Sequence, residues 1–161
     1  MAKSKDVKTN AMRILERMKI PYSHYTYECE EFVDGIQVAD MLGLPHEKVY
    51  KTLVTQSASK EYFVFVIPIA DELDLKKAAR SVGQKSVAMI HVKDINAVTG
   101  YIRGGCTAIG MKKQYRTVIE AKAQELPTVI VSGGRIGSQI ELEPEQLKKA
   151  AQAEFASIVA E

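Results

Sequence analysis

The side chains that carry catalysis in many enzymes are scarce in this chain of 161 residues, which holds three histidines and two cysteines. Protein ligands for zinc usually come from such residues at short, regular spacings. The three histidines and two cysteines form no C-x-x-C or H-x-x-x-H pattern. They are His24, His46, His91, Cys29 and Cys106. We therefore expect no metal site. Cys106 follows two glycines, but an unpaired cysteine is more often a small apolar filler than a nucleophile.

Two glycine-rich segments offer backbone N–H groups in place of reactive side chains. The first contains Gly104, Gly105 and Gly110, and the second, directly after an apolar strand, contains Ser132, Gly133, Gly134 and Gly137. Successive N–H groups turned inward can hold an oxyanion or a phosphate. Neither segment fits the P-loop or the G-x-G-x-x-G dinucleotide pattern. Each could be an ordinary turn, but together they indicate a rim that faces a ligand.

Lys51 is the third candidate, because it lies inside an apolar strand pattern that runs from Val49 to Val54. It shares a strand face with Leu53, since side chains alternate between the two faces. A lysine in this phase either faces solvent from an edge strand or points into a polar pocket. In a pocket, its compact positive charge could neutralise a phosphate or an ester oxygen.

Composition is that of an ordinary globular chain, with 46% apolar residues, 26% charged residues and a net charge of +2. A chain of this length can bury about two-thirds of its unfolded surface, so one domain over residues 1–161 needs no disulfide or metal.

No apolar run approaches the ~18–20 residues that cross a bilayer. The N-terminus lacks the apolar block of a signal peptide, so we expect a cytoplasmic protein without membrane association. Clusters of basic residues permit an RNA partner without requiring one.

Helical spacing and capping residues predict helices that alternate irregularly with strands. Helices are expected at 7–18 with Ser4 or Asp6 as the cap, 35–42 between Asp34 and Gly43, 75–83 after Asp74, 93–100, and from Pro144 to Phe155. Strands are expected at 21–28, 48–56, 61–69, 87–90, 116–120, 127–134 and 139–143. The run at 61–69 is apolar almost throughout, which is typical of a strand buried on both faces.

Strands that follow one another closely, such as 49–56 and 61–69, indicate hairpins rather than a regular βαβ repeat. We therefore predict a single α+β domain in which helices pack outside a mixed sheet.

Several motifs occur in a specific order along nearly the whole chain. They are a Lys-Thr-Leu strand, a capped LKKAA helix, a G-Y-x-x-G-G-x-x-x-x-G-x-K-K loop, a V-S-G-G turn, IELEPEQLKKA and AEFASIVAE. In this order they resemble the YbaK/EbsC-type aminoacyl-tRNA deacylases. Within that family the chain looks most like the free-standing Cys-tRNA(Pro) deacylases, which are relatives of the editing domain inserted in bacterial prolyl-tRNA synthetases.

The resemblance implies a mixed, partly barrel-like sheet surrounded by helices, with a small pocket for an aminoacyl ester. It implies clearing of cysteine mischarged onto tRNA(Pro), without a cofactor or metal and with prolyl-tRNA synthetase as a partner. In the family, the counterpart of Lys51 holds the terminal adenosine or its phosphate, and the substrate's own thiol attacks the ester and leaves as a cyclic thiolactone. The residues implied as catalytic are Lys51, Gly104 and Gly105. Those implied in substrate binding are Tyr27, Thr52, Thr107, Ser132, Gly133 and Gly134.

One segment departs from the family pattern, in which the loop reads Gly-Gly-x-Ser-Pro-x-Gly. Here Thr107 and Ala108 stand in place of serine and proline. The extra methyl group of threonine takes space, and alanine lacks the fixed φ of proline. The difference predicts a less rigid loop or a retuned pocket. It leaves open a deacylase for alanyl- or seryl-tRNA, or a non-catalytic module that binds tRNA or a synthetase.

Overall fold

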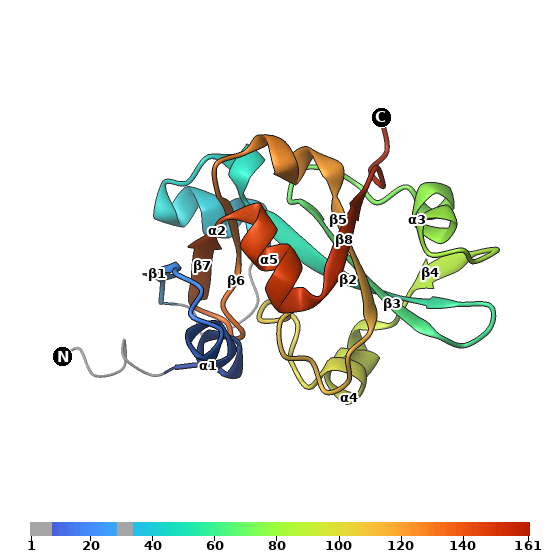
Figure 1. The fold of residues 1–161 in the computed structure, drawn as a ribbon, viewed down its shortest axis with the longest axis horizontal. Coiled ribbons are helices and arrows are strands. Elements are labelled where there is room, and N and C mark those ends of the chain that lie inside the picture. Colours follow the sequence, from blue (N-terminus) through green and yellow to red (C-terminus); the bar gives the residue numbers. More distant parts are fainter. Residues whose placement is uncertain (1–7, 29–33) are drawn as a thin grey trace.

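The computed structural model describes residues 8–28 and 34–161, and in them the strands form two sheets (Figure 1). The smaller sheet is antiparallel, in the order β1 (Ser23–Thr26), β7 (Ser138–Leu142) and β6 (Val129–Ser132). The larger sheet has the order β4 (Val87–Met89), β2 (Tyr50–Ser57), β3 (Tyr62–Pro68), β5 (Arg116–Glu120) and β8 (Ala153–Ala156).

The larger sheet is mixed, as the sequence predicts, because β4, β2 and β3 pair antiparallel whereas β3, β5 and β8 pair parallel. The predicted hairpin of 49–56 with 61–69 is the β2–β3 pair. A parallel bridge between Val49 and Ile130 joins the two sheets. The described strands therefore make two connected sheets and do not close into a barrel.

Helices cover these sheets on the outside (Figure 1). The α-helices are α1 (Asn10–Arg17), α2 (Gly35–Leu42), α3 (Leu75–Ser81), α4 (Ile95–Thr99) and α5 (Pro144–Ala151). Short 3-10 turns, η2 (His46–Lys48), η3 (Val92–Asp94) and η4 (Ala121–Glu125), link them to the strands. The predicted caps are present for α2, where Asp34 and Gln37 form a capping box before the left-handed Gly43, and for α3, where Asp74 accepts two backbone N–H groups.

Strand β3 lies between two hydrophobic cores and is buried on both faces, as predicted. Every residue from Phe63 to Ile67 is at most 5% exposed. Val64 and Val66 pack in one core, which includes residues of α1, α5, β6 and β7. Phe63, Phe65 and Ile67 pack in the other, with residues of α3.

The structure corrects the predicted start of α1. The helix begins at Asn10, and Thr9 is its cap, with a side-chain oxygen that accepts the N–H of Met12 at 3.1 Å. Ser4 and Asp6, the predicted caps, lie outside the described residues.

The prediction of one helix from Pro144 to Phe155 is wrong at its C-terminal end. Helix α5 ends at Ala151, because Gln152 adopts a left-handed conformation with φ of 54°. The next residues form β8, which pairs parallel to β5 with Ala153 opposite Thr117. Pairing with a distant strand therefore overrides the helix propensity of this alanine-rich segment.

Candidate functional site

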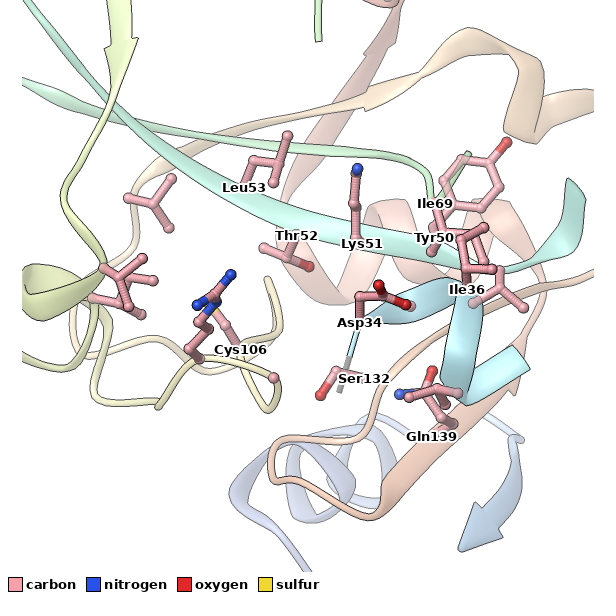
Figure 2. Close-up of a pocket in the computed structure, with 18 of the residues that line it drawn as sticks. Asp34, Ile36, Tyr50, Lys51, Thr52, Leu53, Ile69, Cys106, Ser132 and Gln139 are labelled. Atoms are coloured by element: carbon pink, nitrogen blue, oxygen red, sulfur yellow. The ribbon is translucent and has the colours of Figure 1, made fainter. Parts of the chain in front are cut away.

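A cavity of about 490 Å³ opens beside β2, and its walls come from both sheets, α2, the end of β4 and the glycine-rich loop at 101–110 (Figure 2). This volume falls within the range of small-molecule sites. Most of the wall is apolar, with Ile36, Leu53, Ile69, Met89, Ile90 and Ile95 among its residues. Its polar groups are few, so they define how a ligand can be oriented.

Lys51 is among the residues that line this cavity. It sits opposite Ile67 in the β2–β3 pair and is half-buried. Figure 2 shows the Lys51 and Leu53 side chains on the same side of β2. Within the described part of the chain, no hydrogen bond or ion pair holds the Lys51 ammonium group. Its charge is therefore available to a ligand.

The first glycine-rich loop reaches the cavity with Arg103, Gly104 and Cys106. Gly105 does not line it. A Cβ atom on Gly105 would lie 2.6 Å from the Cα of Arg135, so this glycine lets the first loop press against the second. The structure thus gives Gly105 a packing role that joins the two glycine-rich segments.

The second loop contributes Ser132 to the cavity, whereas Gly133 and Gly134 lie outside its lining. Gly133 packs against Ser138, whose hydroxyl bonds to the His24 ring nitrogen at 3.0 Å. Burial, with the nearby charge of Arg135, lowers the pKa of His24, which favours a neutral ring at pH 7. His24 therefore stabilises the second glycine-rich loop through its bond to Ser138. No histidine of the described chain lines the cavity.

Thr107 and Ala108, the residues that depart from the family pattern, are buried behind the cavity rather than in its wall. Ala108 belongs to the core that includes α1 and β6. The Thr107 hydroxyl is fully buried and has no hydrogen-bond partner within the described part of the chain. The departure therefore changes the packing under the loop, while Thr107 itself does not face the space for a ligand.

Cys106 does line the cavity, a placement that the sequence left open. Burial raises the pKa of its thiol to about 11, against a smaller lowering from a hydrogen bond with Thr99. The thiol is therefore protonated at neutral pH. A protonated thiol is a poor nucleophile, which agrees with the expectation that Cys106 does not attack the substrate.

Tyr27 and Thr52, both expected in the site, also line the cavity. Sequence reasoning missed the polar residues Asp34, Arg103 and Gln139 there. Asp34 was recognised as a helix cap, and its position at the start of α2 carried no sign that it would also face a pocket. Gln139 lies in β7 opposite Ser132 of β6, and only this long-range pairing brings it to the site.

A hydrogen-bonded cluster on Glu141 holds the smaller sheet to the segment that precedes β2. The carboxylate accepts from Lys48 at 2.7 Å and from the hydroxyls of Tyr25 and Thr128. Burial alone would raise the pKa of Glu141, but these three bonds outweigh it and lower the pKa to about 2. The cluster fixes β7, and with it Gln139, relative to the start of β2.

Neither a metal-binding nor a membrane-spanning element is found in residues 8–28 and 34–161. No group of three or more His, Cys, Asp or Glu side chains there could hold a metal ion. In the same residues, no helix is long and apolar enough to cross a membrane.

Residues 30–150 match the model of the aminoacyl-tRNA editing domain. The chain belongs to this family. A curated relative from Enterococcus faecalis, named "Putative Cys-tRNA(Pro)/Cys-tRNA(Cys) deacylase EbsC", is 47% identical over 160 residues and 98% of each chain is covered. Family membership, expected from the order of motifs, is therefore confirmed.

Solved structures of low sequence identity share the fold of this editing domain. A protein titled as a putative trans-editing enzyme for prolyl tRNA synthetase is 18% identical, with a TM-score of 0.78 over 96% of this chain and 100% of its own. A hypothetical protein, APE2540, is 19% identical, with a TM-score of 0.83 over 92% of this chain and 97% of its own.

Proposed function

We propose that this editing domain clears cysteine from mischarged tRNA(Pro) as a free-standing deacylase. The observation that carries the proposal is the cavity beside β2, in which Lys51 and backbone groups meet an apolar wall, in a chain 47% identical to a protein named as such a deacylase. A cysteinyl side chain is small and weakly polar, and it suits a wall formed by Ile90, Val92 and Ile95.

The residues that line the cavity suggest that the reaction relies on binding and orientation. No histidine from the described chain lines the cavity beside the Ser132 and Thr52 hydroxyls, and the Cys106 thiol is protonated, which supports a reaction without a histidine-activated serine, threonine or cysteine nucleophile. In the proposed reaction, the thiol of the substrate loses its proton as its sulfur forms a bond to its own ester carbonyl carbon. The ester C–O bond then breaks, the 3′-oxygen of the tRNA takes up a proton, and the cysteinyl group leaves as a four-membered thiolactone. Hydrolysis of the thiolactone in solution yields cysteine.

We assign the Lys51 ammonium group to the phosphate or ribose of the terminal adenosine. Arg103 and Asp34 also line the cavity, but most of its wall is apolar, and a lysine charge there is worth more than in water because the local dielectric constant is low. The backbone of Gly104, at the rim, is assigned to the developing oxyanion. Gly105, Gly133, Gly134 and Thr107 would then act by fixing the loops that carry Gly104 and Ser132.

We further propose that tRNA selection depends on prolyl-tRNA synthetase and takes place in the cytoplasm with the translation machinery. The small net charge of +2 supports this view, since a protein that binds the whole tRNA alone commonly carries a stronger basic surface. Co-purification of the synthetase with the protein in the presence of tRNA(Pro) tests the association.

A deacylation panel tests the proposed reaction. Cys-tRNA(Pro), Cys-tRNA(Cys), Ser-tRNA(Pro), Ala-tRNA(Pro) and S-methylcysteinyl-tRNA(Pro) are compared at equal concentration. Cys-tRNA(Pro) should be cleaved fastest, and the S-methyl substrate, whose sulfur cannot attack in the same way, should be almost inert. Equal cleavage of the seryl or S-methyl substrate would contradict thiol participation. Binding of tRNA without cleavage of any substrate would identify a non-catalytic module instead.

A further inference from the structure

We propose that the aminoacyl group occupies a gap in the β-ladder between β2 and β6, where it pairs with the peptide groups of Thr52. This inference rests on the proposed deacylase function, and it specifies which backbone atoms hold the reacting ester.

Strand β2 has one complete edge and one interrupted edge. Along the complete edge it pairs with β3 from Tyr50 to Gln56. Along the other edge, Val49 forms a bridge with Ile130 of β6, and pairing with β4 begins only at Thr55. Between these two contacts the described chain supplies no strand beside β2, and the cavity opens there.

The peptide groups of Thr52 face this interrupted edge. The Val49 carbonyl accepts the Ile69 N–H at 2.9 Å on the β3 side, whereas the Val54 carbonyl accepts the Ile90 N–H at 3.2 Å on the opposite side. Successive residues of a strand direct their N–H and C=O groups to alternate edges. Thr52, two residues before Val54, therefore directs both groups toward the cavity, where no residue of the described chain pairs with them.

Ser132 lies across the same gap. The N–H of the next residue, Gly133, donates to the Ser138 carbonyl at 2.9 Å on the β7 side, so the peptide groups of Ser132 face away from β7 and toward β2. If β6 followed β2 beyond the parallel bridge of Val49 with Ile130, Ser132 would lie opposite Lys51, and the Ser132 carbonyl would accept the Thr52 N–H. Ser132 and Thr52 instead line the cavity from opposite sides, as the open space between them in Figure 2 shows.

An aminoacyl ester has the polar groups that such a gap requires. Two residues in a hydrogen-bonded antiparallel pair exchange two bonds, each from the N–H of one to the C=O of the other. The α-ammonium group of the substrate can donate to the Thr52 carbonyl, while the Thr52 N–H donates to the ester carbonyl oxygen. That oxygen becomes negative when the thiol attacks, so the bond from Thr52 strengthens in the transition state and raises kcat.

The experiment removes the N–H of residue 52 without removing a side chain. Thr52→Val is compared with a second protein that carries 2-hydroxyisovalerate at position 52. The second protein has the same valine side chain, but an ester oxygen replaces the backbone N–H. The matched control carries 2-hydroxyisovalerate at Val87. This residue lies on the edge strand β4, and its N–H faces away from β2 because the neighbouring Ala88 pairs with Gln56.

For Cys-tRNA(Pro), the ester at 52 should lower kcat 10- to 100-fold relative to Thr52→Val, roughly the loss for one oxyanion donor. The ester at 87 should leave kcat unchanged. All three proteins should melt at similar temperatures. An ester variant at 52 as active as Thr52→Val would overturn the inference but leave the proposed function intact. A wild-type protein inactive on every charged tRNA would overturn both.

Discussion

Substitution of Gly105 by alanine should impair the site from a position that does not line it. Gly105 is buried where the first glycine-rich loop meets the backbone of Arg135 and Ile136. Its backbone is not in the left-handed region, so the effect of a methyl group here is steric alone.

The size of the effect follows from the contact distances. The new Cβ would lie 2.6 Å from the Arg135 Cα and 2.8 Å from its carbonyl carbon, whereas ordinary contacts begin at 3.4 Å. Backbone atoms cannot rotate away, so the two loops must separate by about 0.8 Å, the difference between 3.4 and 2.6 Å. Overpacking of this kind costs about 1–3 kcal/mol of stability. A displacement near 1 Å in a positioning element can cost about 10²-fold in rate.

The assay compares kcat/KM on Cys-tRNA(Pro) and the melting temperature for wild type, Gly105→Ala and Gly83→Ala. Gly83 is left-handed, with φ of 69°, and has open space around it, so alanine there should cost about 1–2 kcal/mol through strain alone. Both variants should melt a few degrees lower, but only Gly105→Ala should lose about 10²-fold in kcat/KM. An unchanged kcat/KM in Gly105→Ala would refute the coupling of the two loops to the site.

Further predictions concern Lys51, Thr107 and Glu141. Lys51→Ala should lower kcat/KM on Cys-tRNA(Pro) by about 10²-fold or more, since an electrostatic partner of the substrate is lost; full activity would remove Lys51 from the mechanism. Thr107→Val removes a buried, unpartnered hydroxyl and should raise the free energy of unfolding by ~1 kcal/mol with little change in deacylation; a large loss of deacylation would instead give this hydroxyl a role in substrate binding. Because the pKa of Glu141 falls from 4.5 to about 2 on folding, its bonds contribute roughly 3 kcal/mol above pH 5, and this contribution is lost as the pH falls toward 2. Urea unfolding of wild type and Glu141→Gln should therefore differ more at pH 7 than at pH 3, and a pH-independent difference would contradict the assignment.

The parts of the fold that depend on local signals could be predicted from the sequence. Asp34 and Asp74 cap their helices because a carboxylate can reach the backbone N–H groups two or three residues ahead. The buried run at 61–69 was recognisable because almost every residue in it is apolar. The end of α5 was not, because the conformation of 153–156 depends on β5, which lies more than thirty residues earlier in the chain.

The site was predictable only in part, for a related reason. Lys51 drew attention because a charge interrupts an apolar strand, and it does line the cavity. The sequence could not separate Gly104, which faces the cavity, from Gly105, which faces another loop, because neighbouring glycines look alike until their surroundings are known. Gln139 reaches the site through pairing between β6 and β7, for which a single polar residue in a strand gives no signal.

The position of β8 has a consequence for how the protein forms during synthesis. This last strand pairs with β5, and the backbone N–H groups of Ile158 and Val159 beyond it donate to the buried Glu120 carboxylate at 2.9 and 3.2 Å. Until residues 153–159 have left the ribosome, one edge of β5 stays unpaired and Glu120 lacks these partners. The larger sheet should therefore be completed only after these residues emerge, which leaves a nascent chain with an open strand edge that ribosome-associated chaperones can recognise.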